Sequence, residues 1–178
     1  MAGAAVAFVL HAGSGDDGAD PSLRSRPPEL SLVGDDETGG NRGTRLRVLV
    51  VEDDAAMALL CRFNLELAGF EVATATSGAE GLELASAGSY DVVLLDVMLP
   101  DLGGFDVAQL LPDTPVVFLS ARASEADIER GRDAGGIDYI VKPFDPVGLP
   151  ERLQADLEEL ERGGPDGVWQ LRFGPGRV

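Results

Sequence analysis

Acidic, hydroxyl and ammonium side chains stand where the apolar runs of this sequence end. The residues of this kind are Glu52, Asp53, Asp96, Ser120 and Lys142, the last being the only lysine in the chain. Carboxylates packed closely repel one another, and a hard divalent cation such as Mg²⁺ relieves that repulsion. Asp96 beside Mg²⁺ would be a nucleophile toward a phosphoryl group, while Lys142 and Ser120 would hold the phosphoryl oxygens. The set therefore predicts phosphoryl transfer to a carboxylate.

The elements that must bring these residues together follow from the apolar pattern. Strands are predicted at 46–51, 70–76, 91–96, 115–120 and 138–143. They are nearly continuous in apolar residues and are separated by helical patterns, which is typical of a parallel sheet covered on both faces. We expect an α/β fold with a doubly wound, five-stranded parallel sheet. In such sheets the carboxyl ends of the strands form the functional edge.

Helices are predicted between the strands, and two of them depart from a regular length. The predicted ranges are 55–68, 79–87, 105–111, 125–134 and a last helix that begins near Leu149 and ends near Arg162. Pro112 limits the third helix to two turns at most. Pro150 is tolerated only in a first turn, which sets the start of the last helix.

Composition limits the class of partner and the compartment. The 178 residues include 31 acidic and 14 basic side chains, for a net charge of −17. This balance argues against direct binding of DNA or RNA. A single cysteine, Cys61, excludes an intrachain disulfide and fits a reducing compartment. No apolar run approaches the roughly 20 residues that cross a bilayer. We expect a cytoplasmic protein without membrane contact.

The chain divides into three parts by composition. Residues 1–44 are rich in glycine and acids and predict a disordered arm, and residues 45–162 hold the folded domain. Residues 163–178 form a short tail rich in glycine and proline that is too short to fold alone. An apolar stretch at 4–10 lacks the basic residues that open a signal peptide, so a flexible extension is the better interpretation.

Four motifs together resemble the receiver domain of bacterial two-component response regulators. They are LRVLVVEDD (46–54), DVVLLDVMLPDLGGFDV (91–107), TPVVFLSAR (114–122) and DYIVKPF (138–144). The resemblance covers residues 45–162 and implies a flavodoxin-like sheet with strand order 2-1-3-4-5. VEDD, GIDYIVKPF and Arg152 are similar to regulators that carry a winged-helix DNA-binding domain. The end, WQLRFGPGRV, looks like a shortened first strand of such a domain.

The resemblance assigns the phosphoryl and metal site residue by residue. It implies that Asp96 is the phospho-acceptor and that Lys142 assists it. It implies a Mg²⁺ site with Asp53 and Asp96 as ligands, Glu52 acting through water, and the main-chain carbonyl of Met98 completing the protein ligands. The implied donor is a sensor histidine kinase. The protein would be a signalling receiver that promotes its own aspartyl phosphorylation, and not an enzyme.

The resemblance also implies a switch and an output surface. Ser120 corresponds to the switch hydroxyl and Tyr139 to the switch aromatic, which together rearrange the face of the fourth helix, fifth strand and fifth helix. Asp138 and Arg152 are candidates for pairing across a homodimer that depends on phosphorylation. Two solvated surface charges are an equally good interpretation of that pair.

Two other classes of function compete with the phosphorylated switch. The short third helix and Pro150 would suit a degenerate receiver that acts only as a protein-interaction module, although the complete acidic, hydroxyl and lysine set speaks against it. A metal-dependent phosphatase of similar fold is disfavoured because Met98, and no second acid, stands two residues after Asp96.

Overall fold

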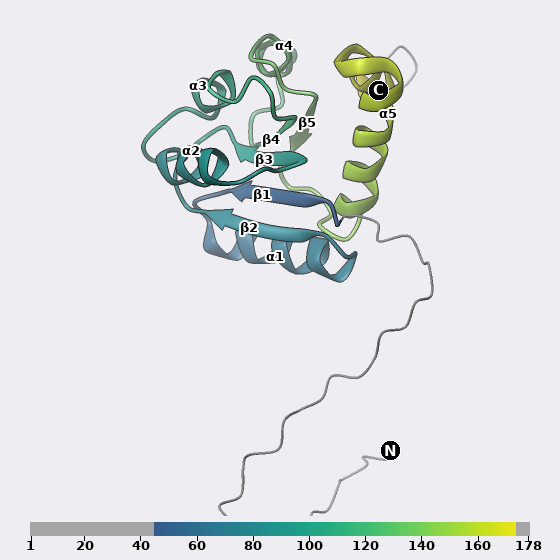
Figure 1. The fold of residues 1–178 in the computed structure, drawn as a ribbon. Coiled ribbons are helices and arrows are strands. Elements are labelled where there is room, and N and C mark those ends of the chain that lie inside the picture. The colour runs from purple at the N-terminus through teal and green to yellow at the C-terminus, as the bar shows by residue number, and fades with distance from the viewer. Residues whose placement is uncertain (1–44, 174–178) are drawn as a thin grey trace, which may run out of the picture. The chain divides into compact units, whose positions relative to one another are not determined.

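Five parallel strands form one sheet in the order β2-β1-β3-β4-β5 (Figure 1). The computed structural model describes residues 45–173. The strands are β1 (Arg47–Val51), β2 (Glu71–Ala75), β3 (Val92–Asp96), β4 (Val116–Ser120) and β5 (Asp138–Val141). The helices are α1 (Ala55–Leu67), α2 (Gly78–Ala87), α3 (Gly104–Gln109), α4 (Glu125–Asp133) and α5 (Leu149–Phe173). The predicted fold class and strand order are confirmed.

Alternation along each strand divides the core into two layers, one on each face of the sheet. Val48 and Val50 of β1 face Cys61 and Leu65 of α1 and the first half of α5. Leu49 and its neighbours on the other face pack against α2, α3 and α4. Figure 1 shows these three helices on the side of the sheet opposite α1. Two covered faces explain why the strands are nearly continuous in apolar residues.

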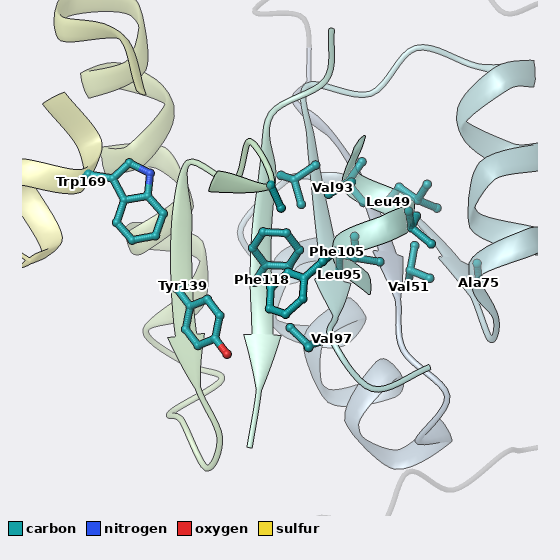
Figure 2. Packing of buried hydrophobic residues seen from close by; sticks show 14 residues of the cluster. Leu49, Val51, Ala75, Val93, Leu95, Val97, Phe105, Phe118, Tyr139 and Trp169 are labelled. Atoms are coloured by element: carbon teal, nitrogen blue, oxygen red, sulfur yellow. The ribbon is translucent and has the colours of Figure 1, made fainter. Parts of the chain in front are cut away.

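Aromatic side chains fill the core layer beneath α3 and α4. Phe118 of β4 meets Phe105 of α3 edge-on, with ring centroids 5.1 Å apart, and lies 6.2 Å from the ring of Tyr139 in β5 (Figure 2). Gly131 of α4 lets these rings come close, because a Cβ there would be only 2.8 Å from Tyr139 Cδ2. Tyr139 is thus wedged between the sheet and α4.

Helix ends follow the capping residues of the sequence. Asp54, Ser77 and Ser124 accept hydrogen bonds from the first-turn amides of α1, α2 and α4. Helix α3 is only six residues long, and α5 begins at Leu149 with Pro150 in its first turn, both as predicted. The Lys142–Pro143 peptide bond is cis.

The last helix does not stop near Arg162 but resumes after a break. Gly164 has a left-handed φ of 66°, and Pro165 opens a second helical stretch that runs to Phe173. We call residues 165–173 the C-terminal segment. Residues 169–173, where the start of a strand was expected, are helical instead, and Val168, Trp169 and Arg172 share one face of this helix and pack on the domain. That the tail is the start of an effector domain stays a prediction. The proposed boundary at residue 162 and the disordered arm stay predictions, and the arm lies outside the described residues.

Four charged side chains form a network beside β5 and α5. Arg152 of α5 binds Asp138 of β5 through Nε and Nη2 at 2.6 and 2.9 Å. Arg172 of the C-terminal segment binds Asp156 of α5 at 2.6 Å. Both carboxylates are completely buried, and within the described residues Asp156 Oδ2 has no hydrogen-bond partner. Burial and the charge of Asp138 raise the pKa of Asp156 to about 7.

We predict that Asp156 makes the fold less stable at pH 8 than at pH 5. Its pKa is raised to about 7 in the folded chain from an ordinary 3.8, so the folded state holds the proton more tightly than the unfolded state. Stability from this group is fully present below the lower value and is lost as the pH rises through 7, by on the order of a few kcal/mol. Urea unfolding at both pH values measures the difference.

The control for this prediction is Asp156→Asn, which keeps the shape of the side chain but cannot titrate. The pH dependence of its unfolding free energy should be smaller than that of the unaltered chain. Equal pH dependence in the two proteins would show that Asp156 does not carry the effect.

Candidate functional site

The register of the sheet places the acidic residues at one edge. Val51 of β1 pairs with Leu95 of β3, so Glu52 and Asp96 are the next residues on adjacent strands. Asp96 in turn pairs with Leu119 of β4, and Ser120 pairs with Val141, which precedes Lys142. One carboxyl edge of the sheet therefore carries the predicted residues from four positions far apart in the sequence.

Lys142 connects the two buried carboxylates of this edge. Its Nζ lies 2.7 Å from Asp96 Oδ2 and 2.6 Å from Glu52 Oε2. Asp96 is 5% exposed and Glu52 1% exposed, so the three charges meet largely out of contact with water. The Met98 amide also donates to Asp96 Oδ1 at 2.8 Å. Asp96 is thereby held in one orientation by two independent donors.

Burial and mutual charge set the protonation of this group. Burial, together with the charge of Asp96, raises the pKa of Glu52 above its ordinary value, although Lys142 opposes the shift. Burial alone lowers the pKa of Lys142, but its hydrogen bonds to Asp96 and Glu52 outweigh this and leave the pKa above the ordinary value. Lys142 is accordingly an ammonium ion at neutral pH.

The acidic residues fit a hard divalent cation. One carboxylate oxygen from each of Glu52, Asp53 and Asp96 lies within 4.8 Å of the others. Asp53 is exposed, whereas its two neighbours are buried, so the group opens to solvent on one side. An all-oxygen donor set with an open side matches the preference of Mg²⁺, which keeps several waters. That the Met98 carbonyl takes part stays a prediction.

Ser120 and Tyr139 are connected through one intervening residue. The Arg122 amide donates to Ser120 Oγ at 3.0 Å, and the Tyr139 hydroxyl donates to the Arg122 carbonyl at 3.1 Å. Ser120 is completely buried and Tyr139 is 1% exposed. Burial raises the pKa of the Tyr139 hydroxyl, which keeps it a donor. A continuous path therefore runs from the acidic edge to the ring beneath α4.

The predicted interface residues lie against each other within the chain. Asp138 is completely buried and its carboxylate is paired with Arg152. Neither is a freely solvated surface charge, because the guanidinium also lies against the main chain of β5. A role for the two residues between copies stays a prediction.

Two residues of the site were not assigned from the sequence. A Cβ on Gly104 would collide with the Asp96 carbonyl oxygen and lie 2.8 Å from Val97 Cα, so only glycine allows α3 to approach the phospho-acceptor candidate. Asp101 accepts from the first two amides of α2, at 2.8 and 2.9 Å, and ties the loop after β3 to that helix. The adjacent glycines Gly103 and Gly104 at the start of α3 were the available sequence signal for Gly104.

The fold and the site together define a class of protein. Its members are doubly wound α/β proteins with carboxylates, a lysine and a hydroxyl at the carboxyl edge of the sheet. The family model of the response regulator receiver domain matches residues 48–154. The chain belongs to this family, and the resemblance drawn from its motifs is confirmed.

Curated relatives are transcriptional regulators. The transcriptional regulatory protein PrrA of Mycobacterium tuberculosis is 44% identical over 136 residues, covering 74% of this chain and 58% of PrrA. The alkaline phosphatase synthesis transcriptional regulatory protein PhoP of Bacillus subtilis is 37% identical over 123 residues, covering 67% of this chain and 51% of PhoP. The chain thus spans about half the length of the curated relatives it matches.

Solved structures of receivers share the fold. A CheY-like receiver domain protein from Methanospirillum hungatei has a TM-score of 0.63 and 30% identity, covering 68% of this chain and all of that one. Chemotaxis response regulator CheY4 of Vibrio cholerae has a TM-score of 0.61 and 31% identity, covering 64% of this chain and 99% of that one. In the part of the chain that is described, no helix is long and apolar enough to span a bilayer.

We predict that Gly104→Ala destabilises the fold and that Gly88→Ala, its control, does not. The new methyl at 104 meets rigid main chain of Asp96 and Val97, and such overpacking costs about 1–3 kcal/mol. At 88 the nearest atom to a methyl would be at an ordinary 3.5 Å. Urea unfolding of both variants measures the change. Equal stability of the two would contradict the close approach at Gly104.

Proposed function

We propose that this chain is a phospho-accepting receiver that takes a phosphoryl group from a sensor histidine kinase onto Asp96 with Mg²⁺. The observation that carries the proposal is Lys142 Nζ, which contacts both Asp96 and Glu52 inside a cluster of carboxylates that fits a divalent cation. A purely structural ion pair would not need a third carboxylate within 4.8 Å or an opening to solvent.

The chemistry is the transfer of one group between two nucleophiles. A carboxylate oxygen of Asp96 forms a bond to phosphorus as the bond from phosphorus to the donor's imidazole nitrogen breaks, and the electron pair of that bond stays on the imidazole. Mg²⁺, when bound by Asp53 and Asp96, supplies neutralisation of the phosphoryl charge. Lys142 stays within reach of the new oxygens because its ammonium already lies 2.7 Å from Asp96.

The signal would leave the site through Ser120 and Tyr139. A phosphoryl oxygen on Asp96 is a strong acceptor that draws the Ser120 hydroxyl toward it. Ser120 Oγ also accepts a hydrogen bond from the Arg122 amide, and the Arg122 carbonyl accepts one from the Tyr139 hydroxyl. A shift of the Ser120 hydroxyl would therefore displace Arg122 and, through it, Tyr139. The output surface would be α4, β5 and α5, which flank the Tyr139 ring.

The location and the partners of the chain are also part of the proposed function. Phosphoryl transfer from the sensor kinase would occur in the cytoplasm, and a homodimer of the phosphorylated chain would use the region around Asp138 and Arg152. Because these two residues pair within the chain at 2.6 Å, a dimer that uses them has to share or exchange that pair. Direct contact with nucleic acid is not part of the proposed role of this chain, whose net charge is −17.

We predict that incubation with acetyl phosphate and Mg²⁺ adds a single phosphate to the chain and that Asp96→Asn adds none. An amide nitrogen or oxygen at this position is not a nucleophile for phosphorus. Intact-protein mass spectrometry with and without a chelator is the measurement.

The matched control is Asp54→Asn, which changes a nearby acid of the same motif. Asp54 caps α1, and asparagine caps as well as aspartate, so this variant should keep the adduct. A folded, unaltered chain that gains no phosphate would contradict the proposal and favour an interaction module that works without phosphorylation.

We predict slow loss of the phosphate once it is formed. Met98 and Arg122 stand two residues after Asp96 and Ser120, and neither side chain can accept a proton from water or align it well. Met98→Glu places a carboxylate there and should shorten the phosphate lifetime. The time course of the phosphorylated mass after removal of the donor tests this. Rapid loss of the phosphate from the unaltered chain would contradict the prediction that Met98 and Arg122 leave the attacking water unactivated.

A further inference from the structure

The C-terminal segment, residues 165–173, crosses from one face of the sheet to the other beside β5. The first half of α5 packs with Leu153 and Leu157 in the core layer shared with α1. After the break at Gly164, Trp169 belongs to the opposite layer, together with Phe118 and Tyr139. Figure 2 shows the Trp169 side chain reaching toward β5 from the last helix. The segment therefore covers the side of the domain where α4, β5 and α5 meet.

Apolar burial fixes the middle of the segment. Trp169 is 6% exposed and Val168 is completely buried. The indole Nε1 of Trp169 donates to the Gly136 carbonyl at 2.8 Å, in the turn between α4 and β5. Gly136 packs closely against the ring of Phe118, because a Cβ at position 136 would lie only 2.5 Å from Phe118 Cε2. The contacts of Trp169 therefore depend on the position of the turn that connects α4 to β5.

Ion pairs hold both ends of the segment to different helices. Asp166 accepts from Arg132 of α4 at 2.6 Å. Arg172 pairs with Asp156 of α5 at 2.6 Å and donates to the Arg152 carbonyl at 2.9 Å. A change in the distance between α4 and α5 would therefore alter the geometry of these attachments.

The segment is fitted imperfectly, which favours reversible docking. A groove of about 510 Å³ that is open to solvent lies between it and α4, lined in part by Ile128, Trp169 and Phe173. Docking also leaves one buried oxygen of Asp156 without a partner among the described residues. The unpartnered oxygen lowers the free energy that holds the segment in place.

The path from the acidic edge ends beneath this segment. Ser120 holds the Arg122 amide, Arg122 holds the Tyr139 hydroxyl, and the Tyr139 ring lies against Gly131 of α4. Arg132, the next residue of α4, is the one that binds the segment. The segment packs on the domain in the conformation in which Ser120 Oγ accepts a hydrogen bond from the Arg122 amide. If the Ser120 hydroxyl turned toward another acceptor, the surface that Trp169 contacts would change.

We propose that residues 165–173 are an intramolecular cap that docks on α4, β5 and α5 and is displaced when a phosphoryl-like anion occupies Asp96. This rests on the proposed function, since it names the element that the switch moves. The coupling is reciprocal by thermodynamic necessity: a cap that docks less well lets the anion bind more tightly.

Trp169 is the only tryptophan of the chain, so its fluorescence reports on the cap directly. The experiment adds Mg²⁺ and beryllium fluoride, a phosphoryl mimic, to the full chain. Calorimetry measures the binding, while tryptophan emission and acrylamide quenching are recorded on the same samples. We expect a shift of the emission to longer wavelength and stronger quenching that both saturate with the binding isotherm, and neither change in Asp96→Asn.

A pair of arginine variants tests the reciprocity. Arg172→Gln removes the attachment to Asp156 and should give red-shifted emission without the mimic, together with an affinity for the mimic that is higher by about fivefold or more. Arg62→Gln breaks an exposed pair with Glu66 on α1 and should leave both quantities unchanged.

The outcomes separate the two proposals. Absence of binding by calorimetry would overturn the phospho-acceptor function itself. Binding with an unchanged Trp169 spectrum, or a red-shifted Arg172→Gln whose affinity equals that of the unaltered chain, would overturn the cap and leave the phospho-acceptor function standing.

Discussion

The ammonium of Lys142 between Asp96 and Glu52 is the interaction on which the rest of this structure depends. Two carboxylates buried side by side would repel each other, and one largely buried cation at 2.6 and 2.7 Å makes their proximity possible. A single ammonium cannot balance three acids, because Asp53 also belongs to the cluster. The remaining negative charge is the physical basis for attracting a divalent cation to this edge.

The parallel sheet makes that arrangement possible, and its two core layers give it an output. Residues from β1, β3, β4 and the end of β5 arrive at one edge because parallel strands end on the same side. The layer that contains Phe118 and Tyr139 lies directly beneath α3 and α4. A dense core transmits small displacements instead of absorbing them, so a shift at the edge is felt at α4.

Sequence reasoning succeeded where chemistry and periodicity coincided. Asp96 and Ser120 end apolar runs, so both the strand and its functional end were readable from the sequence. The roles of Tyr139 and Met98 came only from resemblance to a family. Resemblance also suggested Asp138 and Arg152 as an interface, but burial of Asp138 depends on a helix later in the chain that no local pattern reveals. The C-terminal segment was misread because Gly163, Gly164 and Pro165 have the composition of a linker, whereas Trp169 gains its burial only from distant partners.

The choice of Lys142 has a chemical consequence of its own. It supplies the only side-chain amine of the chain, and every other basic side chain apart from one histidine is a guanidinium. Acylating or glycating agents that react with side-chain amines therefore have one such target, and it lies at the centre of the site. Its raised pKa keeps that nitrogen protonated and non-nucleophilic, and its side chain is only 17% exposed. The same ion pairs that hold the acidic edge together therefore also protect its one vulnerable atom from covalent damage.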